Sequence, residues 1–248
     1  MNSITPPSDK LCGLITVDKP LHRTSMDVVH RVRQAMPRIV VTGKNGNLKE
    51  KWTKVGHAGT LDPLATGLVI CLVGKATKHV NDFMDEPKQY VTTIDLSAFT
   101  TTDDLEGERE EININGDPPS IREIESALVK LTGDVMQTPP IYSAVHVGGR
   151  RAYKLARQGE TPVLKPRIVH IEKMAVMDYA YPMLSLKINC GKGTYIRSIA
   201  RDLGKLLGTG GHLAKLRRTR IGEYHVDEAQ PIERFEQPVV QADLIRLD

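Results

Sequence analysis

The order of helical and strand-like patterns most constrains what this chain can fold into. Strand-like segments are short, as in the apolar run Leu68–Val73 and the alternation from Tyr90 to Leu96. Helical spacing of apolar residues follows Ser25, follows the capping sequence 120–123, and recurs over 194–207. Strands and helices are mixed without a regular strand–helix–strand repeat. The sequence therefore predicts an α+β fold.

Individual elements can be predicted from the same patterns. We expect strands at 54–58 and 213–221, a hairpin around Tyr181-Pro182, a flexible loop at 42–53 and an acidic loop at 101–111. The residues predicted to face the core from the three helices are Val28, Val29, Val32 and Met36, then Ile121, Ile124, Leu128 and Leu131, then Ile196, Ile199, Leu203 and Leu206.

The domain organisation follows from the absence of repeats and of a Pro- or Gly-rich linker. Residues 1–10 are expected to be a flexible leader, residues 11–225 one catalytic domain, and residues 226–248 a C-terminal tail.

Several classes of protein are disfavoured. The longest apolar run, Leu68–Val73, is far below the roughly 18 residues that a membrane helix needs. The N-terminus lacks the pattern of a signal peptide. Cys12, Cys71 and Cys190 are widely separated, so neither a disulfide framework nor a zinc site is expected. These features predict a cytoplasmic protein that binds neither membrane nor metal.

The charge is distributed unevenly along the chain. Residues 142–220 hold 16 Lys/Arg and 4 Asp/Glu, a balance of +12, whereas the remainder holds 18 and 26, a balance of −8. Such asymmetry is typical of a surface for a polyanion, although a solvated basic surface would look the same.

The strongest local motif is the segment 56–67, GHAGTLDPLATG. It places Asp62 in a turn fixed by Pro63, among glycines that allow close approach of another backbone. A carboxylate in such a turn can be catalytic, or it can only bond neighbouring amides.

Two other segments carry weaker signals. Residues 74–76 and 191–194 do not match a phosphate-binding loop in spacing. Arg197 and Arg201 lie one turn apart on a helix face opposite the apolar stripe, which predicts an exposed pair.

Considered together, these segments resemble the TruB family of pseudouridine synthases over residues 11–225. The resemblance is carried, in family order, by Asp18-Lys19-Pro20, Thr24-Ser25, Gly56–Gly67, Gly74–Lys78, Lys88-Gln89-Tyr90, Gln137–Ala144, Gly149, Tyr153–Gly159, Gly193–Gly204 and Leu213–Thr219.

The resemblance implies the pseudouridine synthase fold, with a mixed, mostly antiparallel central sheet flanked by helices and loops. It also implies isomerisation of a T-loop uridine, at tRNA position 55, to pseudouridine after base flipping. Asp62 would be the catalytic nucleophile, Arg197 would pair with it, and Tyr90 would stack on the target base. No cofactor, nucleotide or metal is implied, and a monomer is expected.

Further residues would contact the substrate, the T-arm stem-loop of tRNA. By resemblance, His57 would fill the space that the flipped base leaves, and Leu216 would touch that base. Arg217 and Arg218 are expected to hold phosphates. Lys19 and Tyr195 are further candidates, although Lys19 is better suited to bracing the active-site loop.

Two departures from the family pattern are visible. His146 stands where the family usually has lysine, and only 27 residues follow Ile221, too few for the RNA-binding PUA domain of many relatives. The sequence thus predicts a short form without a complete PUA domain.

Three other functions remain open. A non-catalytic RNA-binding protein would not require Asp62, Tyr90 and Arg197 together. A nucleoside hydrolase would need a second carboxylate or a metal cluster. A guide-RNA-dependent synthase is the nearest rival, although its branch has longer chains.

Overall fold

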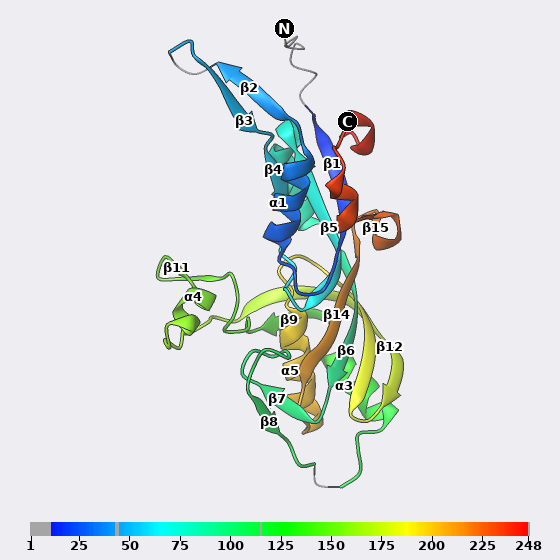
Figure 1. The fold of residues 1–248 in the computed structure, drawn as a ribbon. Coiled ribbons are helices and arrows are strands. Elements are labelled where there is room, and N and C mark those ends of the chain that lie inside the picture. Colours follow the sequence, from blue (N-terminus) through cyan, green and yellow to red (C-terminus); the bar gives the residue numbers. More distant parts are fainter. Residues whose placement is uncertain (1–10, 43–44, 115, 248) are drawn as a thin grey trace. The chain divides into compact units, whose positions relative to one another are not determined.

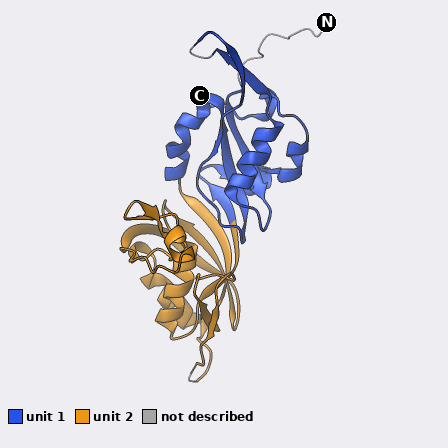
Figure 2. Cartoon of the chain, turned by 60° about the vertical axis from the view of Figure 1, so that its left-hand side comes forward, with its two compact units in different colours: residues 1–86, 218–248 blue, residues 87–217 orange. Residues whose placement is uncertain are grey.

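The computed structural model describes residues 11–42, 45–114 and 116–247, so the expected leader at 1–10 lies outside the described residues (Figure 1). The chain forms two compact units (Figure 2). Unit 1 comprises Met1–Glu86 and Arg218–Asp248, and unit 2 comprises Pro87–Arg217. The region expected to be one domain therefore contributes to both units.

Unit 1 contains mostly antiparallel strands and one longer helix. Its elements are β1 (Gly13–Lys19), α1 (Ser25–Ala35), β2 (Arg38–Thr42), β3 (Leu48–Trp52), β4 (Val55–His57), β5 (Ala65–Val73), η1 (Gly74–His79), α2 (Val80–Asp85), the end of β14 (His212–Ile221), β15 (Tyr224–His225), η2 (Val226–Glu228), β16 (Gln230–Pro231), η3 (Ile232–Glu236) and η4 (Gln241–Asp243).

The core of unit 1 lies around β5. Strand β1 pairs antiparallel with β5 over its whole length, and β4 pairs with β5 over three residues. Helix α1 contacts β4 and β5. It starts at a capping box made by Thr24 and Asp27, and it buries Val28, Val29 and Val32 as predicted.

The segment 42–53 was predicted to be a flexible loop, and that prediction was wrong for Thr42 and Leu48–Trp52, which lie in strands. Strands β2 and β3 pair antiparallel, from Arg38 opposite Trp52 to Thr42 opposite Leu48. They form a two-stranded sheet of their own. Alternation was hard to see in the sequence because polar residues occupy both faces of β3, all of which is exposed.

The segment expected to be a C-terminal tail packs into unit 1. Strand β16 pairs parallel with β1, and Phe235 is 2% exposed. Leu14 and Ile245 exchange two backbone hydrogen bonds of 2.9 Å. Residues 226–247 thus help to cover β1.

Unit 2 contains a set of antiparallel strands and two longer helices. Its elements are β6 (Lys88–Asp95), β7 (Ala98–Thr100), β8 (Arg109–Glu111), α3 (Ile121–Lys130), β9 (Gly133–Gln137), β10 (His146–Val147), β11 (Arg150–Arg151), α4 (Ala152–Arg157), β12 (Arg167–Ala180), β13 (Met183–Cys190), α5 (Ile196–Leu207) and β14 up to Arg217.

Within unit 2, four strands pair in the order β6-β13-β12-β9, each antiparallel to the next. The hairpin predicted around Tyr181-Pro182 is confirmed as β12 and β13. Part of the predicted loop 101–111 is strand β8, which pairs with β7. The prediction of an α+β fold is confirmed.

Helices α3 and α5 pack against each other. Ile124, Leu128, Ile196, Ile199 and Leu203 are buried as predicted. Ile121 and Leu206 were predicted to be buried but are 42% and 45% exposed, because both lie at helix ends.

Candidate functional site

Asp62 lies in the loop that joins β4 to β5 in unit 1. The two strands pair so that His57 lies opposite Cys71, and the loop spans 58–64. Its last turn is closed by a 3.0 Å hydrogen bond from the Ala65 amide to the Asp62 carbonyl. The Asp62 side chain itself is half-buried.

Lys19, at the end of β1, holds this loop through hydrogen bonds from its buried side chain to backbone carbonyls. Its side chain is 0% exposed. The Nζ atom donates to the carbonyls of Arg23 at 2.7 Å, Pro20 at 3.1 Å and Pro63 at 3.5 Å, and to that of Ala65. One ammonium group thus joins the turn after β1 to the residues that follow Asp62.

Arg218 braces the part of the loop that precedes Asp62. Its Nε donates to the Leu68 carbonyl at 2.8 Å, and its Nη2 and Nη1 donate to the carbonyls of Gly59 and Thr60 at 3.2 and 3.4 Å. The side chain is 1% exposed. The prediction that Arg218 holds a phosphate was therefore wrong, because backbone carbonyls occupy all of its nitrogens.

Gly67 allows the backbone of Arg218 to lie close to β5. Its φ is +108°, and a Cβ there would come within 2.3 Å of the Arg218 carbonyl oxygen. Any side chain at residue 67 would push the Arg218 backbone away from β5.

Ser25, the first residue of α1, fixes the residue before Asp62. The Leu61 amide donates to Ser25 Oγ at 2.8 Å, and Oγ donates to the Leu61 carbonyl at 3.3 Å. The Leu61 side chain is 3% exposed. Lys19, Ser25 and Arg218 therefore fix the backbone on both sides of Asp62, whose side chain is half-buried.

The loop lies in an electropositive surrounding. Burial lowers the pKa of Lys19 to about 8, and the carboxylate of Asp62 partly offsets this shift. Burial, followed by the charge of Arg218, also lowers the pKa of His57. His57 is therefore a neutral, half-buried ring at pH 7, which suits a packing role better than phosphate binding.

The lowered pKa of Lys19 predicts a pH dependence of stability. Between pH 8 and 10.5 the unfolded chain binds a proton that the folded chain has lost, so the free energy of unfolding should rise with pH in this window. The gain over the full window is at most about 3 kcal/mol.

Denaturant unfolding at pH 7.0 and about 9.5 checks this, with Lys19→Met as the reference that lacks the group. The wild type should gain more stability on raising the pH than the variant does. Equal changes in the two proteins would contradict the predicted shift.

Unit 2 carries the other candidate catalytic residues. Tyr90 lies on β6 opposite Ile188 of β13 and is 9% exposed. As predicted, Tyr90, Thr92 and Ile94 are on the buried side of that strand. Leu216 and Arg217, on β14, are both half-buried.

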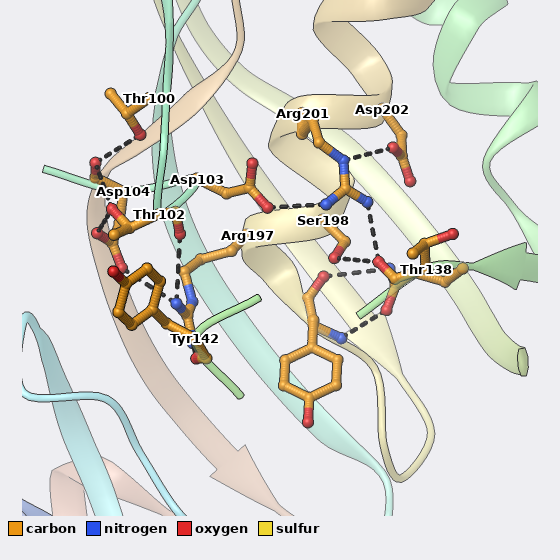
Figure 3. Close-up of polar contacts among 12 residues, drawn as sticks. Thr100, Thr102, Asp103, Asp104, Thr138, Tyr142, Arg197, Ser198, Arg201 and Asp202 are labelled. Atoms are coloured by element: carbon orange, nitrogen blue, oxygen red, sulfur yellow. Dashed lines mark hydrogen bonds and ion pairs between the residues drawn. The ribbon is translucent and has the colours of Figure 1, made fainter. Parts of the chain in front are cut away.

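Arg197 lies in the first turn of α5 and is 6% exposed. The prediction that it belongs to an exposed pair was wrong. Its Nη2 donates to the Tyr142 carbonyl at 3.0 Å, and its Nη1 donates to the Thr102 carbonyl at 3.3 Å and lies 3.4 Å from Asp104 Oδ2 (Figure 3). Two loop segments of unit 2, one at residues 102–104 and one at Tyr142, therefore position the guanidinium.

Arg201, one turn later, is also anchored. It pairs with Asp103 at 2.8 Å and with Asp202 at 3.0 Å, and it donates to the Thr138 carbonyl at 2.9 Å (Figure 3). Burial raises the pKa of Asp103, although Arg201 opposes that shift. Sequence reasoning missed Asp103 and Asp104; two adjacent acids in a segment of otherwise loop-like composition were the signal available.

Tyr195 precedes α5, and Gln137 fixes its backbone. The Tyr195 amide donates to Gln137 Oε1 at 2.8 Å, and Gln137 Nε2 donates to the Tyr195 carbonyl at 3.1 Å. The Arg167 guanidinium lies 5.2 Å from the centre of the half-buried Tyr195 ring. Tyr195 is thus held at a basic, partly open surface of unit 2.

The described part of the chain has neither a cluster of metal-binding side chains nor a membrane-spanning helix. No group of three or more His, Cys, Asp or Glu residues there could hold a metal ion. None of the helices in the described ranges is long and apolar enough to cross a membrane.

Comparisons with known proteins identify the family of this chain. Residues 47–196 match the TruB family pseudouridylate synthase N-terminal domain, and residues 197–244 match the tRNA pseudouridylate synthase B C-terminal domain. The chain is 42% identical over 218 residues to tRNA pseudouridine synthase B of Parabacteroides distasonis, covering 86% of this chain and 87% of that protein. It is 39% identical over 238 residues to the Mycobacterium tuberculosis protein of that name, covering 94% and 74%.

A solved structure supports the fold. A chain of the Cbf5-Nop10-Gar1 complex is 26% identical to this one, with a TM-score of 0.64. The match covers 89% of this chain but only 52% of that chain, so this chain spans about half of its length. The braced Asp62 loop lies within the matched N-terminal region, and the chain belongs to the TruB family of pseudouridylate synthases.

Proposed function

We propose that this protein converts a uridine of tRNA to pseudouridine, at T-loop position 55. The relatives at 39–42% identity are named tRNA pseudouridine synthase B, and the matches cover 86–94% of this chain. This supports tRNA as the substrate, and the position within tRNA is carried over from the resemblance.

The observation that carries the proposal is the braced Asp62 loop. Two buried cations, Lys19 and Arg218, donate to backbone carbonyls on either side of a half-buried carboxylate. Such a fixed backbone lets the carboxylate act without reorganising at the moment of reaction. A turn in which Asp62 served only local structure would not need two buried cations.

The reaction moves the link between uracil and ribose from N1 to C5. The bond from C1′ to N1 breaks, the base turns, a bond from C1′ to C5 forms, and the proton of C5 is lost while N1 gains one. Atoms and electrons balance without an external reductant or nucleotide. A carboxylate can bond to the electron-poor sugar or base in such a sequence, as carboxylates do in glycosidases.

The remaining residues have supporting roles in the proposal. Arg197 pairs with Asp62 and aims it, since a guanidinium offers several fixed donors to a carboxylate. Tyr90 stacks on the target base, and Leu216 adds an apolar contact. His57, neutral by its lowered pKa, fills the space that the flipped base leaves.

RNA affinity would come mainly from the basic segment 142–220. Its balance of +12 favours the phosphates of the T-arm, recognised by shape more than by sequence. Arg217 remains a proposed contact of this kind.

Nucleotide-resolution mapping of pseudouridine in unmodified tRNA treated with the pure protein tests the function. We expect one new pseudouridine in the T-loop, formed without cofactor. If the treated tRNA contains none while the protein still binds it, the chain would be a binding protein and the proposal would fail.

The same experiment addresses the guide-RNA-dependent alternative. Relatives named for tRNA are 39–42% identical to this chain, against 26% for the Cbf5-containing complex. We therefore expect turnover in a reaction that holds only tRNA and protein. A requirement for an added guide RNA would favour the alternative.

Two substitutions at Tyr90 separate its proposed roles. If the hydroxyl moves a proton, Tyr90→Phe alone should slow single-turnover chemistry about 100-fold or more, the usual scale of general acid–base catalysis. If stacking dominates, Phe should be mild and Tyr90→Leu severe. Rates equal to wild type in both variants would make Tyr90 a core residue only.

A further inference from the structure

The β2–β3 hairpin of unit 1 has no role in the site described above. It projects from the rest of unit 1 in both views, and all five residues of β3 are exposed (Figures 1 and 2). A free two-stranded hairpin is marginally stable in water. This one is held at its base, where Thr53, 3% exposed, donates to the Pro37 carbonyl at 2.7 Å, and the Arg38 guanidinium lies 4.2 Å from the Trp52 ring centre.

The strand register places two lysines on the same face of this hairpin. Lys51 lies opposite Ile39 and Lys49 opposite Val41, and directly opposed residues share a face. Ile39 and Val41 are half-buried although the hairpin stands free, since the aliphatic stems of neighbouring lysines can cover them. We call Ile39, Val41, Lys49 and Lys51 the lysine face.

The charge of the lysine face is not neutralised within the described residues. On the opposite face, Arg38 and Glu50 form an ion pair of 3.9 Å, so their charges offset each other. Among the described residues, no carboxylate comes within ion-pair distance of Lys49 or Lys51. The hairpin therefore presents a purely cationic face that suits a polyanion.

The lysine face lies well away from Asp62 within unit 1. Helix α1, whose first residue fixes Leu61, has 11 residues and thus rises about 16 Å. Strands β2 and β3, of five residues each, extend about 17 Å further along the chain. This face would therefore contact the substrate RNA at a place other than the reacting nucleotide.

We propose that the lysine face binds phosphates of the substrate RNA, away from the reacting uridine. The proposal rests on the proposed function for the identity of the RNA, and its physical basis is charge complementarity. The family match begins at residue 47, so strand β2 lies outside it. This contact would extend the RNA-binding surface beyond the basic segment 142–220.

The first test measures affinity for tRNA over a series of salt concentrations. Lys49→Gln with Lys51→Gln should flatten the plot of log affinity against log salt by about one unit per lost contact. Affinity near 0.1 M salt should fall roughly tenfold. Lys49→Arg with Lys51→Arg keeps the charge and should bind like wild type.

A second control removes the same charge elsewhere in unit 1. Lys75 and Lys78, on η1, are exposed. If net charge alone mattered, Lys75→Gln with Lys78→Gln would weaken binding as much as the hairpin variant does. Equal effects, or no effect of the hairpin variant, would overturn the proposal.

Trp52 provides a readout that does not depend on activity. It is the only tryptophan, is 43% exposed and follows Lys51 directly. Saturating tRNA should change its emission in the wild type and equally in Asp62→Asn, and the change should shrink in the Lys49→Gln, Lys51→Gln variant. Trp52 lies on the opposite face beside Arg38, so it reports on the hairpin next to the lysines. An emission change of equal size in that variant at saturating tRNA would overturn the proposal.

Two further outcomes are distinguishable. If the hairpin variant alters self-association of the RNA-free protein but not the salt slope, the face serves contact between copies of the chain and the proposal fails. If tRNA binds as described but no pseudouridine forms, the proposed function fails while the RNA contact at the hairpin stands.

Discussion

Replacing Asp62 with asparagine is expected to abolish pseudouridine formation while tRNA affinity stays within a few fold of wild type. Asparagine has nearly the same shape, and the bonds that fix the loop run from Lys19, Ser25 and Arg218 to backbone atoms. The loop should therefore keep its conformation while it loses the carboxylate. Turnover should fall by roughly four orders of magnitude or more, the scale seen when an enzyme loses its nucleophile.

Single-turnover assays with excess protein measure this loss, and tRNA binding and thermal unfolding are the controls. The melting temperature of Asp62→Asn should match that of the wild type to within about 2 °C. Appreciable turnover by a clean preparation of the variant would show that Asp62 is not the essential group.

Replacing Arg218 with methionine is expected to lower both stability and turnover. Methionine fills much of the space but leaves the carbonyls of Gly59, Thr60 and Leu68 without this donor. A buried polar group left unpaired costs about 1–3 kcal/mol, so the three carbonyls together should cost about 3 kcal/mol or more. For a chain of this size the melting temperature should fall by roughly 6–12 °C.

Turnover at saturating tRNA should fall as well, because the backbone before Asp62 loses its brace. The matched control is Arg217→Met, the neighbouring residue on the same strand, whose side chain points to the opposite face. It should keep the melting temperature within about 3 °C and weaken tRNA binding. An Arg218→Met protein with normal stability and turnover would contradict the bracing role.

Local features of the fold could be read from the sequence. The capping box at Ser120, the hairpin at Tyr181-Pro182 and the buried strand β5 depend on residues close in the chain, and each is confirmed. The resemblance to the family also followed from short motifs in order, and the family matches confirm it.

Elements without a local sequence pattern could not be predicted in this way. The β2–β3 hairpin has polar residues on both faces, so it lacks the alternation that marks a half-buried strand. The C-terminal segment has only short elements, and one of them, β16, forms by pairing with β1, which lies more than 200 residues earlier in the chain.

The sequence by itself determined the family and pointed to Asp62, because motifs and composition are local properties of the chain. Only the tertiary structure decided what the buried cations do. Arg218 bonds the Gly59 carbonyl across 159 residues, Lys19 bonds the Ala65 carbonyl across 46, and Arg197 bonds the Thr102 carbonyl across 95. Every residue carries a carbonyl, so the sequence does not show which one a distant arginine or lysine will bind. For the same reason the sequence predicted that Arg218 contacts a phosphate, whereas in the structure its side chain donates to carbonyls of the loop that carries Asp62.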